Sequence, residues 1–259
     1  MSLKTRRRAR QNSSLVLGTQ VEMNELVKVS HALAREVDRL HFAAPVTHVY
    51  NPLVYARALN DAYLERFARR GPEALFLGMN PGPFGMAQSG VPFGDTTVVR
   101  EWLGLEGQVK KPAIEHPKRP VDGLACTRSE VSGTRFWGWA KDRFRTPEPF
   151  FQRFFVFNYC PLVFMEASGR NRTPDQLPVD EQRALFAVCD AALVRVVALL
   201  EPKLVVGIGG FALARASRAL AGTGIPVGTI LHPSPASPAA NRGWAAAAER
   251  QMVALGLRF

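Results

Sequence analysis

Four short apolar runs, each followed by a turn-forming residue, constrain the fold of this chain more than any other feature. They are ALFLGMN (74–80), FFVFNYCPL (154–162), KLVVGIG (203–209) and VGTIL (227–231). Asn-Pro-Gly, Pro161, a Gly-Gly pair and His232-Pro233 mark their ends. Continuous apolar runs of this length are typical of strands that are buried on both faces of a sheet.

Segments with helical periodicity separate these runs. The spacing of apolar residues predicts long helices over residues 22–40, 52–70, 180–200, 210–220 and 241–255, and short ones at 96–103 and 135–143 within the otherwise irregular segment 81–149. Asp180, which follows Pro178, is the expected N-cap of its helix. Alternation of strands and helices predicts an α/β fold, a three-layer α/β/α sandwich with a central, mainly four-stranded parallel sheet. We expect one domain over residues 21–259.

The composition excludes several classes of protein. Hydrophobic residues make up 47% of the 259 residues and charged residues 21%, which is typical of a globular chain. No uncharged apolar run reaches the roughly 18 residues that a membrane-spanning helix needs, so we expect no membrane association. Cys126, Cys160 and Cys189 are too few and too widely spaced for a disulfide framework or a zinc site, so we expect a reducing, intracellular compartment.

The charge of the chain points to a polyanionic partner. The net charge is +11, and five of these charges lie within the first ten residues, where we expect a flexible basic arm over residues 1–20. From Pro202 to Ala248 there is no acidic residue. Such a balance favours a nucleic-acid-binding protein, and the alternative is arginine that serves solubility alone.

Three polar side chains stand where the apolar runs end. Asn80, Asn158 and His232 follow or close the first, second and fourth runs. Ligands of open parallel sheets bind beyond the carboxyl ends of the strands, so we expect these side chains to converge on one pocket. The alternative is that each satisfies buried backbone groups locally.

Two glycine-rich loops match known ligand-binding motifs only weakly. GMNPGPFGMAQSG (78–90) could surround a ligand closely, but it lacks the Gly-Lys-Ser/Thr ending of a phosphate-binding P-loop. GIGGFA (207–212) matches a loose dinucleotide pattern, but no acidic residue follows to bind a ribose. The sequence contains no HExxH motif, no carboxylate cluster and no persuasive catalytic triad, so we expect neither a metal nor a cofactor.

Taken together, the loops GMNPGPFGMAQSGVPFG and HPSPASPAANRGW resemble the uracil-DNA glycosylase superfamily, and specifically its single-strand-selective monofunctional branch. EHPKRPVDGL, SEVSGTRFWGW, FVFNYCPL and SGRNRTPDQLP are similar to further segments of that branch. The resemblance covers about residues 45–257. It implies an α/β/α fold and a monomeric DNA repair hydrolase that excises uracil and oxidised 5-substituted uracils from single- and double-stranded DNA.

The resemblance also implies roles for individual residues. Asn80 would orient the attacking water and His232 would stabilise the departing base. The base would be enclosed by Met79, Gly82, Pro83, Phe84 and Met86, stacked on Phe93 and read by Asn158. The loop with Ser234, Pro235, Ala236 and Ser237 would enter the duplex, and Arg242 would contact phosphates. Since an amide cannot act as a base, we expect Asn80 to matter more for turnover than for DNA binding.

One position departs from the branch, because Ala236 stands where its vertebrate members carry arginine. We therefore expect a smaller wedge and weaker activity on base-paired uracil than on single strands. A non-enzymatic nucleic-acid-binding protein, a nucleotide-handling enzyme that uses GIGGFA, and a glycosylase for another damaged base are the alternatives.

Overall fold

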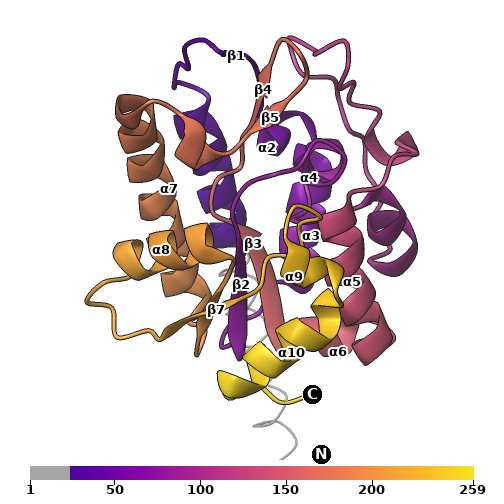
Figure 1. Ribbon diagram of the computed structural model, residues 1–259, viewed down its shortest axis with the longest axis vertical. Coiled ribbons are helices and arrows are strands. Elements are labelled where there is room, and N and C mark those ends of the chain that lie inside the picture. Colours follow the sequence, from indigo (N-terminus) through magenta and orange to yellow (C-terminus); the bar gives the residue numbers. More distant parts are fainter. Residues whose placement is uncertain (1–23) are drawn as a thin grey trace, which may run out of the picture.

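The four apolar runs form one parallel sheet in the computed structural model, which describes residues 24–259 (Figure 1). The arm expected over residues 1–20 lies outside the described residues. The strand order is β3-β2-β6-β7, with β2 at Ala74–Gly78, β3 at Phe154–Asn158, β6 at Val205–Ile208 and β7 at Val227–Ile230. The predicted four-stranded parallel sheet is confirmed.

The register of the sheet brings the strand ends to one edge. Gly78 pairs with Asn158, and Ile208 pairs with Ile230. The segments that follow β2, β3, β6 and β7 therefore leave the sheet side by side, as expected for the carboxyl edge of parallel strands.

Helices cover both faces of the sheet. In Figure 1, α7 and α8 flank it on one side and α5, α6 and α10 on the other. Alternate strand residues serve the two layers: Phe76 of β2 packs edge-on against Phe136 of α5, whereas Phe155 of β3 stacks on Tyr63 of α3. Aromatic rings fill much of this core, where each contributes a large buried area.

Most of the long helices begin and end within a few residues of the predicted limits, and several additional short helices are present. A first described helix covers residues 24–37. The others are α2 Pro52–Tyr55, α3 Arg57–Phe67, α4 Met86–Ser89, α5 Val131–Phe144, α6 Pro147–Phe151, α7 Val179–Leu200, α8 Gly210–Ala219, α9 Pro238–Asn241 and α10 Trp244–Ala254, with single turns η1 Val98–Trp102, η2 Gly123–Ala125 and η3 Pro174–Gln176. The helix predicted at 52–70 is thus divided in two, and the helix predicted at 241–255 begins only at Trp244, after the separate short helix α9.

The expected N-cap of α7 was wrong. The helix begins at Val179 with Pro178 as its N-cap, and the carbonyl of Pro178 accepts a hydrogen bond from the Gln182 amide at 2.9 Å. The carboxylate of Asp180 lies in the first turn and pairs with Arg183 at 3.2 Å. Asp180 therefore favours the helix through its charge near the N-terminus.

A second, small antiparallel sheet was not predicted. It has the order β1-β4-β5, with β1 at Val46–Tyr50, β4 at Val163–Glu166 and β5 at Asn171–Arg172. The run 154–162 was read as one strand, but β3 ends at Asn158 and the chain enters β4 after Pro161. The hairpin of β4 and β5 places residues 171–173 beside the carboxyl edge of the main sheet (Figure 1).

Two further observations bear on the class of protein. None of the helices in residues 24–259 has the length and hydropathy required to cross a bilayer. Cys126, Cys160 and Cys189 are buried and form no disulfide bond.

Candidate active site

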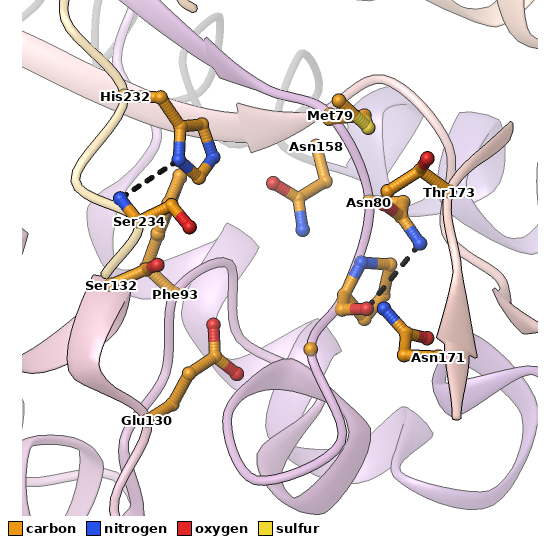
Figure 2. A pocket seen from close by; sticks show the side chains of 12 residues that line it. Met79, Asn80, Phe93, Glu130, Ser132, Asn158, Asn171, Thr173, His232 and Ser234 are labelled. Atoms are coloured by element: carbon orange, nitrogen blue, oxygen red, sulfur yellow. Dashed lines mark hydrogen bonds between the residues drawn. The ribbon is translucent and has the colours of Figure 1, made fainter. Parts of the chain in front are cut away.

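The polar residues expected to converge do converge, on a pocket of about 310 Å³ at the carboxyl edge of the sheet (Figure 2). The residues that line it are Met79, Asn80, Pro81, Gly82, Phe93, Glu130, Ser132, Asn158, Asn171, Thr173, His232 and Ser234. Its size and concave shape are typical of a binding site for a small ligand or part of one.

His232 presents one defined tautomer to the pocket. The backbone N–H of Ser234 donates to Nδ1 of His232 at 3.0 Å (Figure 2), so Nδ1 is an acceptor and the ring proton is on Nε2. Burial lowers the pKa of His232 below its ordinary value. The ring is therefore neutral at pH 7 and offers Nε2–H as a hydrogen-bond donor.

Asn158 closes β3 with its amide in the pocket. Its side chain is 5% exposed, Nδ2 donates to the sulfur of Met86 at 3.2 Å, and Oδ1 is buried without a partner among the described residues. In Figure 2, Oδ1 lies on the side of His232 and Nδ2 on the side of Glu130. An amide held in this way presents an acceptor and a donor side by side.

Asn80 lies across the pocket from His232. Its Nδ2 donates to the carbonyl of Leu162 at 3.1 Å and faces the carbonyl of Pro81 at 3.4 Å. These contacts fix the amide plane. Oδ1 is then the atom that can accept a hydrogen bond from a water in the pocket.

Phe93 forms a wall of the pocket in a strained backbone conformation. Its φ is 54°, which is uncommon outside glycine and costs about 1–3 kcal/mol. The ring stacks on Phe136 with centroids 5.2 Å apart and lies 6.5 Å from the His232 ring. Trp137 donates to the carbonyl of Pro92 at 3.2 Å and holds this segment from the other side.

Three expected base-binding residues do not line the pocket. Pro83 lies in the turn that leads to Gly85, and the Phe84 ring contacts the guanidinium groups of Arg119 and Arg128, whose central carbons are 5.3 and 3.9 Å from the ring centroid. Met86 is buried behind Asn158. Met86 therefore acts on the pocket only through the amide that it contacts.

The expected wedge follows His232 and carries the short helix α9. Pro235, Ala236 and Arg242 are exposed, whereas Ser234 and Ser237 are half-buried. The Ser237 hydroxyl caps α9 by accepting from the Ala240 amide. Of these five residues, only Ser234 lines the pocket.

An arginine of α5 holds this loop, which the sequence did not indicate. Arg135 donates to the carbonyl of Pro233 at 3.0 Å and to Oδ1 of Asn241 at 2.8 Å. Asn241 in turn donates to the carbonyl of Pro235 at 2.9 Å. The conformation of this loop thus depends on a helix about 100 residues away in the sequence.

Sequence reasoning also missed several residues of the pocket wall: Pro81, Glu130, Ser132, Asn171 and Thr173. Glu130 and Ser132 lie at the start of α5, and Asn171 and Thr173 lie on or just after β5. The family resemblance includes their segments, SEVSG and SGRNRTP, but it assigns no role to these individual residues.

Unpartnered polar atoms are concentrated in the pocket. Among the described residues, five buried side-chain oxygens have no hydrogen-bond partner, and three of them belong to pocket residues: Oε2 of Glu130, Oδ1 of Asn158 and Oδ1 of Asn171. Buried polar atoms are usually hydrogen-bonded, so this concentration indicates that the pocket binds a polar ligand. Within residues 24–259, no group of three or more His, Cys, Asp or Glu side chains could hold a metal ion.

Comparison with known families agrees with this geometry. The profile of the Uracil DNA glycosylase superfamily matches residues 65–252. The chain belongs to the uracil-DNA glycosylase superfamily. This match includes Asn80, Asn158 and His232, and it confirms the predicted family.

Individual relatives are similar over most of the chain. The single-strand selective monofunctional uracil-DNA glycosylase of Rattus norvegicus is 52% identical over 227 residues, which are 87% of this chain and 82% of the relative. Its counterpart from Bos taurus is 53% identical over 224 residues, or 86% of this chain and 82% of the relative. The prediction of a uracil-DNA glycosylase is confirmed at the level of enzyme class.

A solved structure supports the fold. The crystal structure of wild-type Pedobacter heparinus SMUG2 aligns with a TM-score of 0.61 and 16% identity, and the alignment covers 88% of this chain and 97% of that one. Since the identity is low, this likeness bears on the α/β/α fold alone, which it confirms.

Proposed function

We propose that this protein hydrolyses the N-glycosidic bond of a flipped-out uracil in DNA and leaves an abasic site. The observation that carries the proposal is the pocket in which Asn80, Phe93, Asn158 and His232 meet. The same pocket contains three of the unpartnered buried oxygens. A base must leave the stack before it can enter such a pocket, which costs a few kcal/mol and less in a single strand.

Recognition of the base rests on Phe93 and Asn158. An aromatic face recovers about 1–3 kcal/mol by stacking on a base. Oδ1 of Asn158 can accept from N3–H of uracil while Nδ2 donates to O4. Cytosine presents the reverse pattern, which would leave buried groups unpaired, so Asn158 rejects it.

Bond cleavage depends on His232 and Asn80. As the bond breaks, negative charge develops on the uracil oxygens, and Nε2–H of the neutral His232 donates to O2. A donor of this kind typically contributes about 3–4 kcal/mol to the transition state. Asn80 holds the water that adds to C1′ of the sugar, and because an amide is not a base the water loses its proton late.

The lining of the pocket supports a monofunctional reaction. A lyase step needs an amine that forms a covalent Schiff base with the sugar. No lysine is among the described residues that line the pocket. The product therefore remains an intact abasic strand.

We extend the proposed substrate range beyond uracil itself. We include 5-substituted uracils such as 5-hydroxymethyluracil, in single and double strands. The exposed Ala236 gives the loop after His232 little bulk to replace a base in the stack, so single strands are preferred.

Outside the pocket, Arg242 contacts phosphates of the DNA backbone. The protein acts as a monomer inside the cell, in the nucleoid of a bacterium or the nucleus of a eukaryote.

The proposal is tested by base release from a single-stranded oligonucleotide that carries one uracil, with alkali to reveal abasic sites. Wild-type protein should release uracil without metal or nucleotide. His232→Ala should lower the single-turnover rate by about 100- to 1000-fold, because it removes the donor to O2. His41→Ala is the matched control, since His41 is exposed and does not line the pocket.

Two results would argue against this function. DNA binding without release of uracil by the wild type would indicate another lesion or a binding protein. Equal rates for wild type and His232→Ala would remove His232 from the reaction.

A further inference from the structure

The carboxyl group of Glu130 packs against the bend of the loop at residues 82–85. Glu130 is the N-cap residue of α5, but its side chain makes no cap hydrogen bond. It points instead toward the bend between Gly82 and Gly85, where a Cβ atom on either glycine would collide with the carboxyl oxygens. The two glycines thus provide the space that the carboxyl group occupies.

This carboxyl group is incompletely paired, in contrast to its acidic neighbour. Oε2 of Glu130 is buried without a partner among the described residues. Asp95 accepts hydrogen bonds from the Ser129 hydroxyl at 2.7 Å and from the Thr97 amide at 3.1 Å. Glu130 is therefore the member of the pair that has bonding capacity left for a ligand.

The orientation of Asn158 determines which part of a base faces Glu130. Around a uracil ring, O2, N3, O4 and C5 follow in this order. With O2 at His232, N3 at Oδ1 and O4 at Nδ2 of Asn158, the next position is C5. Nδ2 contacts the sulfur of Met86 and lies on the side of Glu130 (Figure 2), so a base bound in this orientation would turn its C5 edge toward Glu130.

We propose that Glu130 is a specificity-determining residue, whose carboxyl group selects bases by the hydrogen-bonding character of the substituent at C5. The inference rests on the proposed function. A carboxylate accepts a hydrogen bond from the hydroxyl of a 5-hydroxymethyl group. A neutral carboxyl group donates to the carbonyl oxygen of a 5-formyl group. A 5-methyl group pairs with neither form and leaves Oε2 unpaired.

Charges around Glu130 set the balance between these two forms. Burial, together with the carboxylate of Asp95, raises the pKa of Glu130 to about 7, while a backbone hydrogen bond from Gly85 opposes the rise. The other titratable group of the pocket is His232, which is neutral at pH 7. Arg128, two residues before Glu130, directs its guanidinium onto the Phe84 ring.

The test compares single-turnover excision of 5-hydroxymethyluracil and 5-formyluracil from the same oligonucleotide between pH 6 and pH 8. A pKa of about 7 raises the ionised fraction of Glu130 from about one tenth to about nine tenths over this range. The ratio of the hydroxymethyl rate to the formyl rate should therefore rise by up to about 100-fold, because the ratio of ionised to neutral Glu130 changes from about 1:10 to about 10:1. Uracil is excised in parallel at each pH.

Glu130→Gln provides the reference, because glutamine has the same shape and does not titrate. Dividing each wild-type rate by the rate of Glu130→Gln at the same pH cancels the intrinsic reactivity of each base. In Glu130→Gln the ratio of the hydroxymethyl rate to the formyl rate should change with pH only through the intrinsic reactivity of the two bases. Asp95→Asn should move the midpoint of the rise to lower pH, because removing the neighbouring charge favours the ionised Glu130.

The outcomes separate this inference from the proposed function. A ratio with the same pH dependence in wild type and Glu130→Gln overturns the role of Glu130 while uracil excision stands. Loss of uracil excision by the wild type at every pH would instead overturn the function. If Glu130→Gln does not fold, as judged by circular dichroism, an unmoved midpoint in Asp95→Asn decides against the proposal.

Discussion

At the scale of single residues, the site depends on a position that has no side chain. Gly78 ends β2 and pairs with Asn158 across the ladder. A Cβ atom on Gly78 would collide with Oδ1 of Asn158 and come within 2.8 Å of the Phe93 ring. The Asn158 amide and the Phe93 ring, which we expect to bind the base, thus pack directly against the backbone of Gly78. A side chain at this position would displace both of them.

Gly78→Ala should accordingly lower the single-turnover excision rate by about 100-fold or more, because β2 is fixed by strands on both sides and the displaced groups are Asn158 and Phe93. Overpacking of this kind costs about 1–3 kcal/mol in the free energy of unfolding. Gly138→Ala in α5 is the control. Its Cβ meets nothing within 4 Å and alanine favours a helix by about 0.5–1 kcal/mol, so the rate should be unchanged and the stability equal or higher. A normal rate for Gly78→Ala would mean that Asn158 and Phe93 do not act from these positions.

At the scale of elements, α5 contributes to the site in three ways: its N-cap residue is Glu130, Phe136 stacks on Phe93, and Arg135 holds the loop after His232. The strand runs, and with them Asn80, Asn158 and His232, could be predicted because periodicity and strand ends are local properties. The role of α5 could not be predicted, because Arg135 bonds to carbonyls that are distant in sequence. β5, with two residues, is too short for any pattern, so Asn171 was missed.

Arg135→Ala should therefore slow excision about tenfold or more, and more on double-stranded than on single-stranded DNA, where the loop has no base to replace. Each lost charge-assisted hydrogen bond contributes about 1.5–3 kcal/mol to the order of the loop. Arg143→Ala on the same helix is the matched control. It breaks the ion pair with Glu249 of α10 and leaves the loop after His232 unchanged. A solvent-exposed ion pair contributes at most about 1 kcal/mol to the free energy of unfolding. Rates for the two strand types that fall equally in Arg135→Ala would show that the loop does not enter the duplex.

At the scale of the whole molecule, the proposed function assigns the binding of DNA and the chemistry on the base to different parts of the chain. The residues that line the pocket include one carboxylate and, among the described residues, no lysine or arginine. The net charge of +11 therefore attracts DNA from outside the pocket, and five of these charges belong to the first ten residues. Electrostatic attraction of this kind depends on salt, whereas hydrogen bonds within a desolvated pocket depend on it little.

This division predicts the effect of replacing Lys4, Arg6, Arg7, Arg8 and Arg10 together by glutamine. Each phosphate contact on a single strand contributes about 0.7 to the slope of log affinity against log salt concentration, so the slope should fall by up to about 3.5. The single-turnover rate at saturating protein should stay the same, because the pocket lies within residues 24–259. Affinity is measured by fluorescence anisotropy with a labelled single strand at several salt concentrations. An unchanged slope would assign the phosphate contacts to the remaining basic residues such as Arg242, and a lower rate at saturation would mean that the basic segment also acts on the bound base.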